Sequence, residues 1–220
     1  MGEEHAWNAA AEVWVDEVRR GDRGPVHLHD DVLRELLPPP RGLTVDAGSG
    51  EGRWTRELRE RGHDVLGVDR SEKLVELARE ADPDGRYEIG ALEQLPLADS
   101  SAALVLTVNV LPHVVELEPV VAEFARVLEP GGVLLIGTIH PVMEASTFDE
   151  ETEEFRMRSY FAAEEHAVPL GHHHVFHQHR TLEGYLRPLL AAGFAFDDIR
   201  EVPGRTGKLP RYLVLRLTRR

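Results

Sequence analysis

Short apolar runs and amphipathic runs alternate along most of the chain, which is the pattern of an α/β domain. The run 102–108 is apolar without alternation, as expected for a central strand covered on both faces. Ser71 is expected to cap one helix, and Pro119 to open another that Pro-Gly-Gly at 130–132 ends. Strands are predicted at 43–45, 65–68, 86–89, 102–108 and 133–136, with helices after the first, second and fourth.

The two ends of the chain complete this domain. Residues 5–20 carry Trp7, Trp14 and smaller apolar residues at spacings of three and four, which predicts a helix. A short helix is expected at 31–37, and a helix from Leu182 to Gly193 precedes strands at 194–202 and 212–217. We expect one domain, divided into a helical cap at 1–40, a cofactor-binding core at 41–140, a lid or substrate region at 141–180, and a helix with a strand pair at 181–220.

Charge and composition narrow the function. The chain has 220 residues, with 25 Lys and Arg against 39 Asp and Glu, a formal net charge of -14 that opposes binding to a phosphate backbone. A small-molecule partner is favoured over nucleic acid. Cysteine is absent, and acids throughout the first 20 residues fit neither a signal peptide nor a spanning segment. We therefore expect a cytoplasmic protein without membrane insertion.

A glycine-rich turn follows the first predicted strand. Gly48, Gly50 and Gly52 follow Asp46, and the second strand ends in Asp69, which could accept two ribose hydroxyls. The spacing does not match the six-residue dinucleotide fingerprint. Asp46 would also repel a pyrophosphate at the helix start, whereas it suits a cationic amino-acid ligand. The pattern predicts a nucleoside-type cofactor that carries a positive charge.

Further motifs follow the glycine turn. They are Gly67-Val68-Asp69-Arg70-Ser71, Leu95-Pro96-Leu97 and Ala125-Arg126-Val127-Leu128-Glu129-Pro130-Gly131-Gly132. Together with Val45-Asp46-Ala47-Gly48-Ser49-Gly50-Glu51-Gly52, they resemble the class I S-adenosylmethionine-dependent methyltransferases, specifically the small-molecule group similar to the ubiquinone and menaquinone methyltransferases. The resemblance runs from about Trp7 to the C-terminus. It implies a Rossmann-like, doubly wound, seven-stranded α/β sheet, mostly parallel with an antiparallel C-terminal strand.

The resemblance also implies how S-adenosyl-L-methionine is held. Asp46, Gly48 and Gly50 would line its methionine part, Asp69 would bind the ribose hydroxyls, and Arg70 would lie beside the adenine. The family often carries an acid at the position of Ala91, so we expect the backbone to recognise adenine here. The expected cofactor-binding residues are Asp46, Gly48, Ser49, Gly50, Asp69, Arg70, Ala91, Leu92 and Asn109.

Two histidines are candidate catalytic bases. A sulfonium methyl group is already activated, so the protein must align the acceptor and remove a proton where the acceptor carries one. His113 follows the strand at 102–108 and His140 follows the strand at 133–136, where ligands of open α/β sheets collect. Each histidine also fits a packing role. The predicted function is methyl transfer to an oxygen, nitrogen or carbon of a small molecule.

Two segments leave alternatives open. Residues 143–171 are acidic without a regular apolar period, which indicates an insertion or a mobile lid. In 172–179, a strand would place His173, His177 and His179 on one side, where a metal could bind. No carboxylate follows at a recognisable ligand spacing, so we expect no metal and a strand at the edge of the acceptor pocket.

Three other functions fit parts of the pattern. A non-catalytic protein could bind the same adenosyl ligand. An NAD-dependent oxidoreductase would share the strand and glycine turn, although the glycine spacing disfavours it. A histidine metal module would use residues 172–179 alone.

Overall fold

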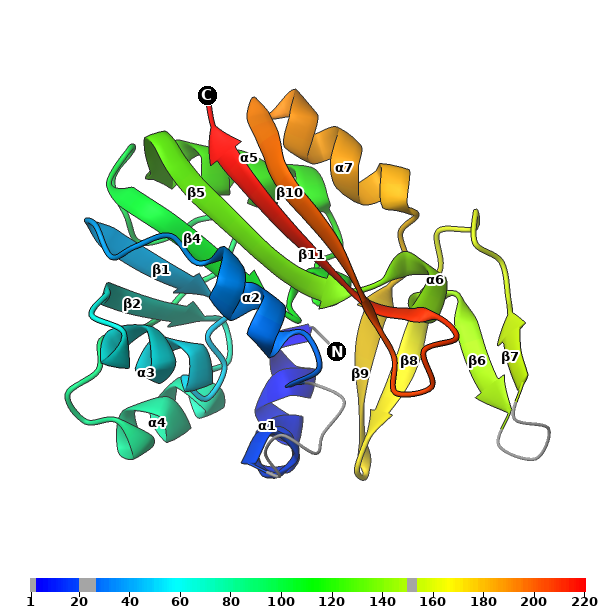
Figure 1. The fold of residues 1–220 in the computed structure, drawn as a ribbon. Coiled ribbons are helices and arrows are strands. Elements are labelled where there is room, and N and C mark those ends of the chain that lie inside the picture. The colour runs from blue at the N-terminus through cyan, green and yellow to red at the C-terminus, as the bar shows by residue number, and fades with distance from the viewer. Residues whose placement is uncertain (1–2, 20–26, 150–153) are drawn as a thin grey trace.

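The computed structural model describes residues 3–19, 27–149 and 154–220, and it is built around a seven-stranded sheet in the order β10-β11-β5-β4-β1-β2-β3 (Figure 1). Neighbouring strands from β3 through β5 pair in parallel, and β11 pairs antiparallel with both β5 and β10. This confirms the predicted fold class. The strands are β1 (Leu43–Ala47), β2 (Asp64–Asp69), β3 (Tyr87–Ile89), β4 (Ala102–Val108), β5 (Leu128–Ile139), β10 (Phe194–Pro203) and β11 (Pro210–Arg219).

Helices cover both faces of this sheet (Figure 1). Leu33 of α2 and Leu58 of α3 pack on one face, whereas Phe124 of α5 and Tyr185 of α7 pack on the other. No described helix is long and apolar enough to cross a membrane. The helices are α1 (Glu3–Arg19), α2 (Asp30–Leu36), α3 (Arg53–Glu60), α4 (Glu72–Ala81), α5 (Leu117–Val127), α6 (Pro141–Glu144) and α7 (Leu182–Ala191), with a short 3-10 helix, η3 (Leu111–His113).

Strand β4 shows why its sequence lacks alternation. Leu104 and Leu106 join the core on the side of α2 and α3, whereas Val105 joins the core on the side of α5 and α7. Successive side chains point to opposite faces of a strand, and here both faces are buried, so every position except Thr107 is apolar.

Several predicted boundaries are confirmed and two are wrong. The side chain of Ser71 caps α4 by accepting a hydrogen bond from the Leu74 amide, as predicted. Helix α5 begins at Leu117 instead of Pro119, and β5 begins at Leu128, before the Pro-Gly-Gly turn. Residues 130–132 form a bulge within the β4–β5 pairing, because the register shifts between the pairs Ala102–Leu128 and Leu104–Val133.

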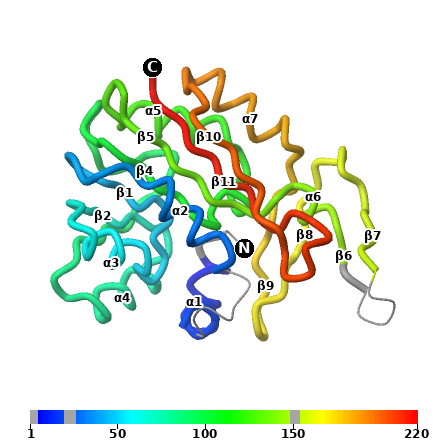
Figure 2. Tube along the Cα trace, viewed as in Figure 1, coloured from blue at the N-terminus to red at the C-terminus, as the bar shows by residue number. Residues whose placement is uncertain are grey.

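Residues 141–180 fold outside the main sheet. They form α6 and two antiparallel hairpins, β6 (Ser146–Asp149) with β7 (Glu154–Met157) and β8 (Glu165–Leu170) with β9 (His173–Gln178). The tube view shows the β8–β9 hairpin beside α1 (Figure 2), and β9 contacts both α1 and η3. The segment is thus an ordered insertion in its described part, and its role as a lid or substrate region stays a prediction.

Candidate cofactor-binding and catalytic site

The glycine turn after β1 has a conformation that few other residues can adopt. Gly48, Gly50 and Gly52 have φ angles of 80°, 55° and 83°, in the left-handed region. A Cβ atom on Gly48 would lie 2.2 Å from Cγ2 of Val110, so side-chain volume is excluded there as well. The turn is closed by hydrogen bonds from the amides of Gly48 and Ser49 to the Val68 carbonyl, at 2.8 and 3.0 Å.

Asp69 lies at the end of β2 and faces this turn. Its Oδ2 accepts a hydrogen bond from the Gly50 amide and its Oδ1 accepts one from the Ser71 amide, both at 2.8 Å. Burial raises the pKa of Asp69, and these backbone donors oppose that rise. The two hydrogen bonds fix the plane of the carboxylate, and each oxygen keeps a lone pair for a ligand.

A cavity of about 660 Å³ lies against the turn. The walls come from α1 and from the segments that follow β1, β2, β3 and β4, at the point where the strand order reverses and open α/β sheets bind ligands. The lining residues include Trp7, Trp14, Gly48, Gly50, Asp69, Arg70, Leu74, Gly90, Leu92, Glu93, Asn109, Val110, His113 and Val114.

A second, more polar cavity of about 440 Å³ adjoins the first and shares Trp14, Gly48, Gly50 and Asn109 with it. Asp46, Glu51 and Arg53 line this second cavity, so it presents charges of both signs, and the Arg53 guanidinium also donates hydrogen bonds to the Asp30 carboxylate. Oδ2 of Asp46 accepts a hydrogen bond from Oγ1 of Thr55 at 2.6 Å, and burial raises the pKa of Asp46 to about 6. A zwitterionic group, with an ammonium and a carboxylate, matches charges of both signs.

Asn109 stands where β4 ends and lines both cavities. Its φ angle of 60° is unusual for a residue with a side chain, and its amide donates a hydrogen bond to the Gly137 carbonyl at 2.8 Å. Its Oδ1 is buried without a hydrogen-bond partner among the described residues. A strained backbone and an unsatisfied buried oxygen at a cavity wall are features of a ligand-binding residue.

Comparison with known proteins identifies the family. A family model described as a methyltransferase domain matches residues 45–136, the stretch that carries the glycine turn and Asp69. The chain is 35% identical over 116 residues to the malonyl-[acyl-carrier protein] O-methyltransferase of Serratia marcescens, covering 51% of this chain and 46% of that protein. It is 31% identical over 170 residues to the ubiquinone biosynthesis O-methyltransferase of Sinorhizobium fredii, covering 73% and 63%. The chain thus matches about half the length of such curated relatives.

The crystal structure of an S-adenosylmethionine-dependent methyltransferase from Mesorhizobium loti has the same fold, with a TM-score of 0.73 and 27% identity over 87% of this chain and 98% of that one. Residues 45–136 thus form a methyltransferase domain within the fold of the S-adenosylmethionine-dependent methyltransferases. The predicted family and its cofactor, S-adenosyl-L-methionine, are confirmed.

Most of the residues that the sequence predicts for the cofactor lie together in this methyltransferase. Asp46 and Ser49 line the polar cavity, Arg70 and Leu92 line the larger one, and the turn and Asn109 separate the two. Ala91 is not among the lining residues, and it forms an isolated β-bridge with Gln94. Its neighbours Gly90, Leu92 and Glu93 line the wall instead, and recognition of adenine by the backbone at Ala91 stays a prediction.

Sequence reasoning underestimated the contribution of α1 to the site. Trp7 and Trp14, which the sequence places on a predicted helix, both line the larger cavity. Their rings meet edge to face with centroids 5.6 Å apart. Asn8 on the same helix accepts hydrogen bonds from Oγ of Ser71 and the amide of Lys73, at 2.7 and 3.2 Å. The spacing of the tryptophans showed that they share a face of the helix, but not what that face covers.

His113, the last residue of η3, lines the larger cavity. Its Nδ1 lies 3.0 Å from the Phe176 carbonyl, which can only accept, so Nδ1 carries the hydrogen and Nε2 keeps a lone pair. Burial, helped by the nearby His177 ring, lowers the pKa of His113 to about 3. The imidazole is therefore neutral near physiological pH and can accept a hydrogen bond.

His140 occupies a different place. Its Nδ1 accepts a hydrogen bond from the Val142 amide at 3.1 Å and caps α6, and its Nε2 lies 3.0 Å from Oε1 of Glu201. It is buried and is not among the lining residues of either cavity. With its Nδ1 lone pair already engaged, the ring has a structural role in this arrangement. The two histidines follow neighbouring parallel strands, so their sequence positions alone do not distinguish them.

Proposed function

We propose that this chain transfers a methyl group from S-adenosyl-L-methionine to an oxygen, nitrogen or carbon atom of a small molecule. The main support is the Asp69 carboxylate, held by two backbone amides against the glycine turn at the wall of a cavity. Bound there, the cofactor supplies a methyl group on a positively charged sulfur, which needs no metal or further activation.

The residues of the cleft fit the parts of the cofactor. The Asp69 carboxylate would accept hydrogen bonds from the two ribose hydroxyls, with Leu92 and Arg70 on the adenine side. In the polar cavity, Asp46 would lie near the ammonium of the methionine part and Arg53 near its carboxylate. The Oδ1 atom of Asn109 would gain a polar or cationic partner that the described residues do not supply.

The acceptor would occupy the part of the larger cavity near His113. Val110, Val114 and Trp7 make this wall largely apolar, and the Nε2 lone pair of His113 is its basic atom. A hydroxyl or amine of the acceptor could donate a hydrogen bond to Nε2, which would orient the nucleophile. We therefore assign His113, in preference to His140, to the acceptor.

Release of S-adenosylhomocysteine across a panel of small-molecule acceptors tests the proposal. Wild-type protein should release it with at least one acceptor, and Asp69→Ala should lower kcat/KM at least tenfold. Glu88→Ala, which removes an exposed carboxylate from the neighbouring strand β3, is the matched control and should keep wild-type activity.

The other functions give different results in the same assays. A non-catalytic adenosyl-binding protein would bind the cofactor but release no S-adenosylhomocysteine with any acceptor. An NAD-dependent oxidoreductase would be stabilised against heat by NAD and not by S-adenosylhomocysteine. Either result would contradict methyl transfer.

A further inference from the structure

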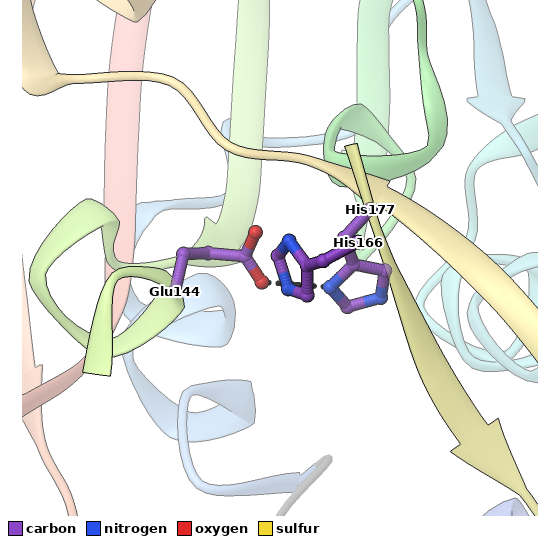
Figure 3. Close-up of side chains that lie close together, drawn as sticks. All are labelled: Glu144, His166 and His177. Atoms are coloured by element: carbon purple, nitrogen blue, oxygen red, sulfur yellow. Dashed lines mark hydrogen bonds and ion pairs between the residues drawn. The ribbon is translucent and has the colours of Figure 1, made fainter. Parts of the chain in front are cut away.

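Three metal-ligating side chains meet outside the cofactor cavity. Glu144 ends α6, and His166 and His177 are paired directly across the β8–β9 hairpin, so both rings lie on the same face of it. Figure 3 shows the Glu144 carboxylate directed at the two imidazoles. These three residues are called the Glu144 cluster below.

The spacing within the Glu144 cluster is close to that of a metal site. One ligand atom from each residue lies within 4.8 Å of the other two, and Oε1 of Glu144 is 2.7 Å from Nδ1 of His177. Tetrahedral zinc with bonds of 2.0–2.1 Å holds its ligand atoms about 3.3 Å apart. Small side-chain rotations would therefore bring all three atoms to coordination distance.

The Glu144 carboxylate is buried, and only one of its two oxygens has a partner among the described residues. Only 3% of its side chain is exposed, and its Oε2 has no hydrogen-bond partner among the described residues. An ionised carboxylate in such a place is costly unless it is paired or coordinates a metal. The Glu144 backbone is also held, because Arg158 donates a hydrogen bond from Nη2 to its carbonyl at 3.1 Å.

We propose that Glu144, His166 and His177 bind one divalent transition-metal ion such as zinc. Imidazole and carboxylate ligands suit this class of ion, and three protein ligands leave a coordination position open. The sequence alone predicts no metal here, because Glu144 lies on another element 33 residues before His177. The fold supplies the carboxylate that the histidine run lacks.

The Glu144 cluster borders the acceptor side of the cleft. The ring of His177 meets the ring of His113 edge to face, with centroids 4.6 Å apart, and His113 lines the larger cavity. An ion in the cluster would thus lie behind the wall that faces the acceptor. This link to the acceptor rests on the proposed function, whereas metal binding itself does not.

Zinc titration of metal-stripped protein without a histidine tag tests the site, using competition with a chromophoric chelator. Wild-type protein should bind one zinc ion tightly per chain. Glu144→Gln, His166→Gln and His177→Gln should each weaken that binding at least tenfold. His174→Gln is the matched control, because His174 is exposed on the other face of the same strand and should not affect the tight site.

Three companion measurements make the result decisive. Thermal unfolding of each variant shows whether it is folded, and cobalt(II) absorption reports the ligand geometry directly. Binding of S-adenosylhomocysteine should be unchanged in the three variants, so a failed metal site is distinguishable from a failed cofactor site.

Absence of tight zinc binding to the wild type would overturn the proposal and leave Glu144 and His177 as a hydrogen-bonded pair. Equal affinity in folded His177→Gln and His174→Gln would also overturn it, since it would indicate adventitious binding to exposed histidines.

Discussion

Asp46 is a buried carboxyl group whose titration should be linked to cofactor binding. Burial raises its pKa from 3.8 to about 6 in the free protein, so above pH 6 the folded state carries an unfavourable negative charge. The resulting loss of stability is present above pH 6 and disappears as the pH falls below 3.8, where the folded and unfolded states are both protonated. The ammonium of the cofactor would stabilise the ionised form.

We therefore predict that affinity for the cofactor falls in acid. As the pH drops below about 6, Asp46 takes up a proton that binding must release, and Kd should rise by up to about tenfold per pH unit. Calorimetric titration with S-adenosylhomocysteine between pH 5 and 8 measures this slope. Asp46→Asn should bind more weakly at pH 7, and its affinity should lack this component of the pH dependence. An unaltered slope in Asp46→Asn would contradict the assignment.

Gly48 combines a left-handed backbone with a close neighbour. Gly48→Ala should lower the free energy of unfolding by about 2–4 kcal/mol, because a strained φ angle and a contact with Val110 are both imposed. Gly193→Ala is the matched control: its φ angle is 89°, but nothing lies within 4 Å of an added Cβ, so only about 1 kcal/mol should be lost. Urea unfolding measures both values. Equal losses would mean that Val110 moves aside and that crowding does not explain the glycine.

Helix α1 lines the larger cavity and is joined to α4 by apolar contacts of Ala11 and Val15 with Leu74 and by hydrogen bonds to Asn8. Asn8 accepts hydrogen bonds from Oγ of Ser71, the N-cap residue of α4, and from the amide of Lys73 in the first turn of α4. Removing both contacts should lower the local stability by about 1–2 kcal/mol. We predict that Asn8→Ala increases amide exchange of α1 and speeds dissociation of S-adenosylhomocysteine about tenfold. Glu12→Ala, at an exposed position of the same helix, should change neither rate. Wild-type exchange in Asn8→Ala would show that the apolar contacts of α1 are sufficient to hold the helix.

Substitutions of the two candidate histidines should have different effects, because His140 caps α6 and His113 lines the larger cavity. His140→Ala removes the cap of α6 and should cost about 1 kcal/mol of stability without weakening cofactor binding. His113→Ala removes a side chain from the cavity wall and should lower turnover of a panel acceptor at least tenfold. Thermal unfolding and initial rates check the pair. A larger loss of turnover in His140→Ala than in His113→Ala would reverse the assignment.

At the scale of the whole molecule, the sequence predicted the sheet because its strands and helices carry local signals. Strand β4 is apolar at every position except Thr107, since both its faces are covered, and Ser71 caps α4 through its own side chain. The glycine turn and Asp69 were predictable for the same reason. Glycine allows the left-handed φ angles of the turn, and the Asp69 carboxylate accepts hydrogen bonds, so both properties can be inferred from the residue type.

The remaining features depend on contacts between distant segments. Trp14 lies on a predictable helix face, but only the docked α1 places its ring in the cleft. Glu144 and His177 come from separate elements, and only Val175 and His177 of the short β8–β9 hairpin are buried, so the hairpin has little apolar signal to mark it. In the sequence, His140 and His113 both follow a predicted strand, and the contact between His140 and Glu201 is visible only in the structure.

Calorimetric titration of wild-type and Asp69→Ala protein with S-adenosylhomocysteine tests the central claim most directly. The account predicts one binding site per chain for the wild type, at least tenfold weaker binding for Asp69→Ala, and no binding of NAD to either protein. No binding to the wild type, equal affinity in the two proteins, or saturable binding of NAD would contradict it.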